Sequence, residues 1–255
     1  MPRIVNIMPM AGLGKRFFKS SFNLPKPLIK IQNKPMFIKA AKSMPKSNLN
    51  IFICNKKLSK QYNIHKILSK EFGKKFKLIT VKKTTKGQAS TCMLAKKFLG
   101  KDDKIFIHSC DSLIKFNINK LKNNLTKYDG VIFTTKPNDN HVKNIKSFGW
   151  VSLKNKKIHK ITCKKKASLS PKKDLVIIGT FAFQNKNIFL KLTNDLIRNK
   201  EKINNEYYLD MVFKIAIEKK YNIKNIKVSS YYSWGTPSEL MDWKKKFEKN
   251  KLNDD

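Results

Sequence analysis

Arginine is nearly absent from this sequence, although its charge is strongly positive. The chain has 56 basic and 17 acidic residues, and only 3 of the basic ones are arginine, so its formal charge is +39. Proteins that read phosphates and base edges favour arginine, because its planar fork binds both through paired hydrogen bonds. The lysines also occur in every segment, whereas nucleic-acid surfaces usually carry a clustered basic stripe. We therefore assign the charge to solvated surface, and nucleic-acid binding remains an alternative that rests on charge alone.

Long apolar runs are missing too. No run approaches the roughly 18 residues of a membrane span, and residues 1–7 lack the apolar core and cleavage site of a secretory signal. Glycine and proline occur nine times each, which excludes collagen-like and low-complexity chains. We expect no membrane span and no secretion.

Cysteine is scarce and widely spaced. No CxxC pair occurs among the four cysteines, which excludes the common zinc motifs and a disulfide framework. We expect reduced thiols in a cytoplasmic protein, at Cys54, Cys92, Cys110 and Cys163.

Short β-rich runs alternate with helical patterns along the 255 residues. We predict strands at 3–10, 50–54, 76–81, 104–110, 130–135, 149–153, 158–163, 175–184 and 226–234. We predict helices at 35–42, 65–72, 88–99, 117–124, 186–198, 206–219 and 237–249. Such alternation indicates βαβ units and a mostly parallel sheet covered on both faces, with a mixed second half. We expect one domain over 1–248 and a polar C-terminal tail over 249–255.

A glycine-rich turn follows the first predicted strand directly. The segment 8–17 reads MPMAGLGKRF. A turn of this kind lets backbone N–H groups approach an anion closely, and Lys15 and Arg16 add positive charge there. It is not a Walker loop, because no G-K-[ST] follows, and Phe17 stands where a G-x-G-x-x-G motif needs glycine. About ten residues on, two prolines restrict the backbone around Lys26, which favours a preorganised contact with an anion.

These two elements, in this order, resemble the opening of the sugar-1-phosphate nucleotidyltransferases. The resemblance recurs along nearly the whole chain, in Gly87-Gln88-Ala89-Ser90-Thr91, Ser109-Cys110-Asp111, Phe148-Gly149-Trp150-Val151, Ile178-Gly179-Thr180-Phe181-Ala182-Phe183, Asn205-Glu206-Tyr207-Tyr208 and Trp234-Gly235-Thr236-Pro237. It implies a Rossmann-like, three-layer α/β/α fold of the GT-A-like nucleotidyltransferase type with a mostly parallel, mixed central sheet. It also implies transfer of a nucleoside monophosphate from a nucleoside triphosphate to a small phosphorylated acceptor.

The resemblance assigns a role to each site residue. The catalytic set is Arg16, Lys26 and Asp111, and Asp111 would also hold Mg²⁺. The nucleotide-binding set is Met10, Ala11, Gly12, Gly14, Lys15, Gln88 and Ala89, and the acceptor-binding set is Gly149, Lys165, Thr180 and Glu206. From the residues alone, Asp111 also suits a strand-end cap and Glu206 a charge at a helix start.

Three positions depart from the family pattern. Ser233 stands where many members have a second metal-binding aspartate. The family's lysine that contacts the acceptor phosphate cannot be aligned uniquely within the three lysines at 164–166, and we select Lys165. Lys15 replaces the usual Thr or Ser before Arg16. A non-catalytic family member is therefore an alternative, which the intact Gly12, Arg16, Lys26 and Asp111 argue against.

The expected partners are a nucleoside triphosphate and a small phosphorylated acceptor, with no nucleic acid and no membrane. The acceptor of first choice is a sugar 1-phosphate used for surface polysaccharide, and phosphocholine with a cytidine nucleotide is the alternative. The sequence names neither the base nor the acceptor, and it leaves a homodimer open.

Overall fold

The computed structural model describes residues 2–17 and 22–252. Its strands are β1 (Ile4–Met10), β2 (Lys30–Ile31), β3 (Lys34–Pro35), β4 (Leu49–Asn55), β5 (Phe76–Val81), β6 (Lys104–His108), β7 (Ser112–Lys115), β8 (Gly130–Thr135), β9 (Gly149–Lys154), β10 (Lys157–Cys163), β11 (Leu175–Phe183), β12 (Ile223–Lys227) and β13 (Ser230–Ser233). Its α-helices are α1 (Met36–Lys42), α2 (Lys56–Gln61), α3 (Ile64–Phe72), α4 (Gln88–Met93), α5 (Ile118–Lys127), α6 (Asp139–Lys143), α7 (Lys186–Arg198), α8 (Leu209–Glu218) and α9 (Pro237–Leu252).

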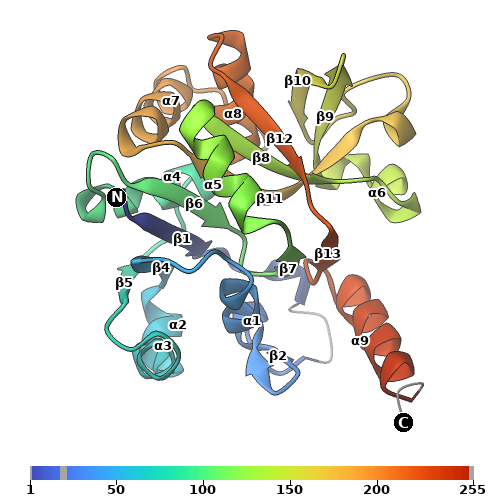
Figure 1. Cartoon of the computed structure of the whole chain (residues 1–255). Coiled ribbons are helices and arrows are strands. Elements are labelled where there is room, and N and C mark those ends of the chain that lie inside the picture. Colours follow the sequence, from blue (N-terminus) through green and yellow to red (C-terminus); the bar gives the residue numbers. More distant parts are fainter. Residues whose placement is uncertain (1, 18–21, 253–255) are drawn as a thin grey trace.

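The central sheet is parallel in its first half and antiparallel in its second (Figure 1). β1 pairs in parallel with β4 and β6, and β4 pairs in parallel with β5. β11 then runs antiparallel to β6, β8 and β9, and β9 is antiparallel to β10, while β12 joins β8 in parallel. The expected mixed sheet is confirmed.

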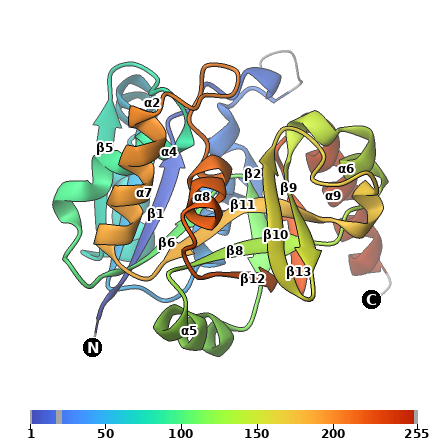
Figure 2. The same cartoon turned by 90° about the horizontal axis from the view of Figure 1, so that it is seen from above.

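Helices cover both faces of this sheet, as the predicted three-layer arrangement requires. On one face, the alternate strand residues pack against α4, α7 and α8. On the other face, the remaining strand residues pack against α1, α3 and α5. Figure 2 shows α7 and α8 together on one side, with the β9–β10 hairpin set to the side of them. Since neither face is left to solvent, strands such as β1 and β4 are apolar at nearly every position.

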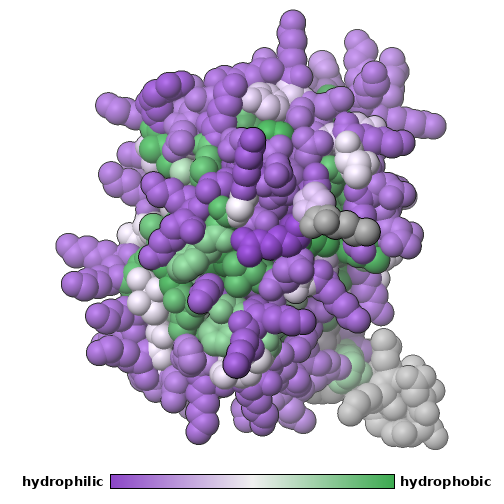
Figure 3. Space-filling model, turned by 60° about the vertical axis from the view of Figure 1, so that its left-hand side comes forward, coloured by the Kyte–Doolittle hydropathy of each residue, from purple (hydrophilic) through white to green (hydrophobic). Residues whose placement is uncertain are grey.

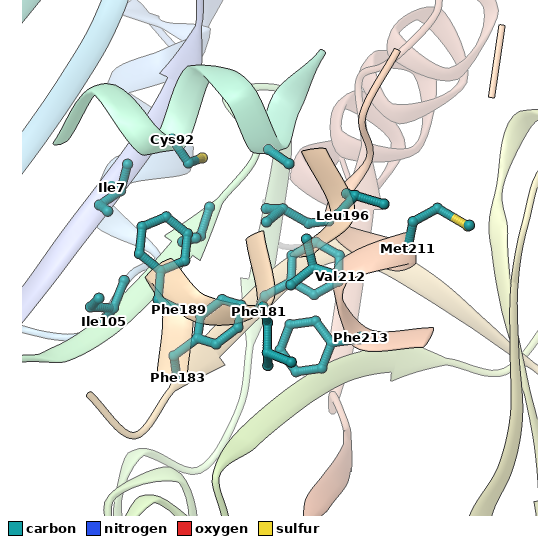
Figure 4. Packing of buried hydrophobic residues seen from close by; sticks show 14 of the residues in the cluster. Ile7, Cys92, Ile105, Phe181, Phe183, Phe189, Leu196, Met211, Val212 and Phe213 are labelled. Carbon is teal, nitrogen blue, oxygen red and sulfur yellow. The ribbon is translucent and has the colours of Figure 1, made fainter. Parts of the chain in front are cut away.

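Aromatic rings fill the first of these cores (Figure 4). The ring of Phe213 on α8 stacks on Phe181 with centroids 5.3 Å apart and contacts Phe183 at 4.8 Å. Phe189 of α7 contacts Phe183 at 5.2 Å. All four side chains are fully buried, so they join the helices to β11, the strand at the centre of the mixed half.

Asparagine residues start many of the helices. The side chains of Asn55, Asn63, Asn117, Asn138 and Asn185 each accept a hydrogen bond from a backbone N–H in the first turn of the helix that follows. Asparagine is among the preferred N-cap residues, because the oxygen of its short side chain accepts a hydrogen bond from an N–H group that has no partner within the helix. The abundant asparagine of the sequence therefore has a structural use.

The structure corrects several predicted elements. The strand expected at 226–234 is two strands, β12 and β13, which belong to different sheets. The strand expected at 104–110 ends at His108, and β7 follows after a turn. The helix expected at 88–99 changes to a 3₁₀ helix after Met93, and the helix expected from 206 begins at Leu209. The short helices α2 and α6 were not predicted, because six and five residues carry too little periodicity.

A third, smaller cluster attaches α9 to the N-terminal segments. Trp234 and Leu240 pack with Phe17, Ile29 and Met36, and Trp243 covers them from α9. The ring of Trp243 meets Trp234 edge-on, with centroids 5.5 Å apart. The start of α9 is therefore held beside the loop that follows β1.

The surface is mostly hydrophilic in the view of Figure 3. Hydrophilic side chains are spread over the whole visible face, with apolar side chains between them. Within residues 2–17 and 22–252, no helix is both long enough and apolar enough to cross a membrane.

Candidate active site

One large cavity lies at the carboxyl ends of β1 and β6, where α/β sheets usually bind ligands. Its volume is about 1090 Å³. Its lining comes from five parts of the chain. These are the glycine-rich turn (Ala11, Gly12, Leu13, Gly14 and Arg16), the loop before α4 with the first residue of that helix (Thr84, Thr85, Gly87 and Gln88), the turn after β6 (Ser109 and Asp111), strands and helices of the second half of the chain (Asn140, Phe148, Gly149, Gly179, Glu206, Tyr208 and Asp210), and the segment from the end of β13 into α9 (Ser233, Gly235, Thr236 and Glu239). The cavity is large enough for two phosphorylated ligands.

The glycine-rich turn brings Lys26 into the site. Gly14 has a φ of +64°, and a Cβ added there would lie 3.1 Å from Cβ of Lys26. The backbone N–H of Phe17 donates to the Gly14 carbonyl at 2.9 Å, which closes the turn. Glycine is needed at this position because it has a left-handed backbone and lies against another side chain.

Lys26 forms an ion pair with Asp111 at the centre of the cavity. Its ammonium donates a hydrogen bond to Asp111 Oδ2 and a second one, of 3.2 Å, to the Gly235 carbonyl. Burial opposes the charge on both side chains, but their mutual attraction outweighs it, so the pKa of Asp111 is lowered and that of Lys26 is raised. Arg16 lies close enough to Lys26 to repel its charge. Asp111 and Lys26 are therefore both ionised, and Arg16 adds a further positive charge close to the pair.

A small two-stranded sheet holds the other wall beside Asp111. β7 and β13 pair antiparallel, with Ser112 opposite Ser233 (Figure 1). The backbone N–H of Trp234 donates to the Asp111 carbonyl at 2.8 Å. Ser233 and Gly235 thereby stand next to Asp111, although more than one hundred residues separate them in the chain.

His108 is a buried residue that holds the turn carrying Asp111. Its ring is fully buried, with Nδ1 2.8 Å from Thr180 Oγ1 and Nε2 3.0 Å from the Ser112 carbonyl. Burial lowers the pKa of His108 to about 4, so the ring is neutral at physiological pH. His108 and Thr180 therefore hold the turn that carries Asp111, and neither lines the cavity.

The loop before α4 is joined by backbone hydrogen bonds to the segment that carries Glu206. The Tyr207 N–H donates to the Lys86 carbonyl at 2.8 Å, and the Ala89 N–H donates to the Tyr207 carbonyl at 3.0 Å. A Cβ on Gly87 would lie only 2.5 Å from the Tyr207 nitrogen. Gly87, with a φ of +106°, is thus required both by its backbone conformation and by this close approach.

We predict that Gly87→Ala lowers the free energy of unfolding by about 1–3 kcal/mol, because the methyl group meets backbone atoms that cannot move away cheaply. Urea denaturation of the purified variant measures this loss. Gly73→Ala is the matched control, since Gly73 also has a positive φ but faces open space. Equal effects of the two substitutions would show that the contact with Tyr207 is unimportant.

Two further carboxylates line the cavity, of which the sequence predicted only Glu206. The other is Asp210, in the first turn of α8, whose Oδ2 lies 2.2 Å from the point that a Cβ on Gly149 would occupy. Burial raises the pKa of Asp210 to about 6, while the Cys163 thiol and the charge of Lys164 lower it. The sequence shows Asp210 only as an acidic residue in a helix, so it contained no signal that this side chain faces a cavity.

Asp210 makes the stability of the fold depend on pH. Its pKa is higher in the folded chain than in the unfolded chain, so ionisation costs stability, and the free energy of unfolding falls as pH rises from about 4 to 6. We predict that Asp210→Asn is more stable than the wild type at pH 8, by on the order of 1–2 kcal/mol, and equally stable at pH 4. Urea denaturation at both pH values tests this, with the exposed Asp242→Asn as control. A pH-independent difference would contradict the assignment.

The structure brings most of the predicted site residues together. The cavity is lined by Ala11, Gly12, Gly14, Arg16, Gln88, Asp111, Gly149 and Glu206, and Lys26 reaches it through Asp111. Met10, Ala89 and Thr180 are buried in the wall. Lys165 lines a separate cavity of about 340 Å³ beside β10 and α8, whereas the Lys164 ammonium lies 5.0 Å from the Tyr208 ring centroid, beside the main cavity. The Lys15 side chain lies outside the described part of the chain.

The residues at Asp111 suit magnesium held jointly by protein and ligand. Magnesium prefers oxygen ligands and is commonly bound by one or two carboxylates together with substrate phosphates. Asp111 presents such a carboxylate to a cavity lined by anion-binding groups. In the portion of the chain that is described, no three His, Cys, Asp or Glu side chains form a metal cage, so phosphate oxygens would complete the coordination.

Comparisons with known proteins agree with this geometry. The family model described as "Nucleotidyl transferase" matches residues 6–250. Among solved structures, the nucleoside-diphosphate-sugar pyrophosphorylase from Vibrio cholerae RC9 is similar with a TM-score of 0.75 at 20% identity, covering 93% of this chain and 98% of that one. The inositol-1-phosphate CTP transferase from T. maritima is similar with a TM-score of 0.69 at 16% identity, covering 92% and 90%.

A UDP-glucose pyrophosphorylase complexed with UDP-glucose is similar with a TM-score of 0.72 at 16% identity, covering 98% of this chain and 100% of that one. No curated protein matches the sequence significantly.

Proposed function

Because this chain belongs to the nucleotidyl transferase family, we propose that it transfers a nucleoside monophosphate from a nucleoside triphosphate to a sugar 1-phosphate, forming a nucleoside diphosphate sugar and pyrophosphate. The observation that supports the proposal is the Lys26–Asp111 pair, whose Asp111 lines the same cavity as the glycine-rich turn and the carboxylates Glu206 and Asp210. The two ends of the cavity accommodate the two substrates, and their phosphates meet at the pair.

The reaction needs positioning and charge stabilisation more than a specialised nucleophile. An oxygen of the acceptor phosphate attacks the α-phosphorus, a new P–O bond forms, and the bond to the bridging oxygen breaks as pyrophosphate leaves. A phosphate monoester is already nucleophilic, so binding both phosphates in line supplies most of the rate enhancement.

Each cationic side chain has a place in this scheme. Arg16, and Lys15 beside it, bind the β- and γ-phosphates and stabilise the leaving group. Lys26 contacts the α-phosphate and the attacking phosphate, where negative charge accumulates in the transition state. Asp111 would hold Mg²⁺, which supplies positive charge to the phosphate oxygens when bound.

The remaining residues bind the uncharged parts of the substrates. The backbone of the turn at Ala11, Gly12 and Gly14 lies under the nucleotide, beside Met10 and Ala89 in the wall, and Gln88 reads the base. Gly149 and Glu206 face the acceptor, together with Lys165 or, on its position beside Tyr208, Lys164. Asp210 accepts hydrogen bonds from acceptor hydroxyls in the same place.

A second acceptor class has support of its own. Glu206 and Asp210 stand beside the aromatic side chains of Phe148 and Tyr208 at the acceptor end. Carboxylates and aromatic faces together favour a cation such as a quaternary ammonium group. Phosphocholine with a cytidine nucleotide is therefore the alternative substrate pair.

The proposed reaction suggests how the product is used and where the enzyme acts. Nucleoside diphosphate sugars supply surface polysaccharide synthesis, and we propose this role for the product. We propose a cytoplasmic enzyme, because the proposed reaction consumes nucleoside triphosphates and the four cysteines are free. A homodimer is the assembly we propose to test by light scattering.

Pyrophosphate release tests the proposed function directly. The purified protein is incubated with Mg²⁺, one nucleoside triphosphate and one acceptor at a time, taken from sugar 1-phosphates, inositol 1-phosphate and phosphocholine. Release with a single pair identifies reaction, base and acceptor together. Asp111→Ala should abolish that release, whereas no release with any pair, in a protein that no triphosphate stabilises against heat, would support a non-catalytic protein.

A further inference from the structure

Three side-chain oxygen atoms lie within 4 Å of the point that a Cβ on Gly235 would occupy, two from residues close to it in the chain and one from Asp111. A Cβ added to this glycine would lie 3.1 Å from Glu239 Oε2, 3.4 Å from Ser233 Oγ and 3.6 Å from Asp111 Oδ2. All four residues line the large cavity. Gly235 has no positive φ that would require glycine, so its missing side chain matters because it keeps the space between these oxygens open.

The start of α9 positions Glu239 toward this space. The Glu239 N–H donates to Thr236 Oγ1 at 3.2 Å, and that hydroxyl donates to Glu239 Oε2 at 3.1 Å. The Trp234 and Leu240 side chains on either side are fully buried in the cluster that holds α9 against the rest of the chain. The packed first turn of α9 therefore fixes the Glu239 side chain toward the space beside Asp111.

A cation already lies at this place in the structure. The Lys26 ammonium contacts both Asp111 Oδ2 and the Gly235 carbonyl. Since an ammonium group and a small metal ion seek the same oxygens, Lys26 marks the position as one that stabilises positive charge. Ser233 offers only a hydroxyl there, so one further carboxylate is needed for a site with two.

We propose that Glu239 supplies the second carboxylate of a divalent cation site, with Asp111 as the first and Ser233 as a neutral oxygen beside them. This inference rests on the proposed function for the identity of the remaining ligands, which would be phosphate oxygens of the nucleotide. Glu239 replaces the carboxylate that position 233 lacks, and it comes from the next helix instead of from the strand end. Lys26 competes with the cation for Asp111 and moves to the substrate phosphates when the cation binds.

Titration of the full chain with Mn²⁺ alone, followed by electron paramagnetic resonance of the free ion, tests the site without any turnover. Glu239→Gln keeps the acceptor for Thr236 but removes the charge, and we expect it to raise the Mn²⁺ dissociation constant about tenfold or more, since even outer-shell changes cost about 10–100-fold. Glu218→Gln, on the exposed side of α8, is the matched control and should leave binding unchanged. Wild-type affinity in Glu239→Gln, or no saturable binding in the wild type, would overturn the proposal.

Three further variants separate ligation from a structural role of Glu239. Ser233→Asp in the Glu239→Gln background should restore Mn²⁺ binding, because the new carboxylate stands on the other side of the same space. Gly235→Ala should weaken binding by filling it, and Lys26→Met should tighten binding by removing the competing ammonium. A merely structural Glu239 would lower the thermal stability of Glu239→Gln without raising its Mn²⁺ dissociation constant. Absence of the rescue by Ser233→Asp would also contradict the site, whereas the tightening in Lys26→Met tests only the competition at Asp111.

The outcome is distinguishable from that of the proposed function. Glu239-dependent Mn²⁺ binding without pyrophosphate release from any substrate pair would refute the function and keep the site. Pyrophosphate release with Mn²⁺ binding that ignores Glu239 would keep the function and refute the site.

Discussion

Lys26→Met is expected to lower kcat for pyrophosphate release by about 10²–10³-fold, the usual effect of removing one preorganised group that stabilises transition-state charge. Lys26 forms an ion pair with Asp111, and its side chain is only 15% exposed. In such a site its charge acts on the phosphates with little screening by water. Because the charge develops mainly in the transition state, kcat should fall more than KM rises.

The measurement is a steady-state pyrophosphate assay with the substrate pair that the release experiment identifies. Lys30→Met is the matched control, since Lys30 is a neighbouring lysine whose side chain is exposed on β2. Lys26→Arg keeps the charge but not the shape of the ammonium, so it should retain part of the activity. A kcat within threefold of the wild type in Lys26→Met, with a normal circular dichroism spectrum, would contradict the catalytic assignment.

Phe181→Ala is expected to reduce the free energy of unfolding by about 3–5 kcal/mol, the usual cost of removing a buried aromatic side chain. Phe181 is fully buried at the centre of β11 and stacks on Phe213 of α8 (Figure 4). Its removal leaves a cavity between the sheet and the helix, which close-packed neighbours fill only in part.

Urea denaturation should show a lower midpoint with an unchanged slope, because the fold of the native state is retained. Leu169→Ala is the control, since Leu169 is 90% exposed and its truncation should change the free energy by less than about 0.5 kcal/mol. Phe213→Ala should be similarly destabilising, and the double variant should lose less than the two losses added, because the rings contact each other. A loss below about 1 kcal/mol in Phe181→Ala would contradict this account of the core.

Several features of the site followed from local sequence. The turn after β1 needed only a strand, two glycines and adjacent positive charge, and these are neighbours in the chain. Lys26 between its two prolines was likewise predicted from a short segment, whereas the role of Asp111 after β6 was predicted only from the family resemblance. In the first two cases the chemistry depends on residues within a few positions of one another, so the sequence contains the signal.

Side-chain direction in the second half of the sheet could not be predicted. The pairing of β11 with β8 shifts between Ile177 and Phe181, and Gly179 there has a φ of +67°. Such an irregularity interrupts the alternation of strand faces. Thr180 therefore points to His108, while Gly179 lines the cavity. Lys164 has a φ of +57° at the end of β10, and this local turn places it, and not Lys165, beside Tyr208.

The sequence by itself determined the alternation of strands and helices and the glycine-rich turn, and it named Lys26 and Asp111 as candidates without showing that they form an ion pair. Hydrophobic periodicity and turn chemistry act over short distances, so they can be recognised without the fold. Only the tertiary structure decided that Asp210 and Glu239 face the same cavity as Asp111. Each is an ordinary acidic residue in the first turn of a helix, and the packing of α8 and α9 against the sheet directs its carboxylate into the site.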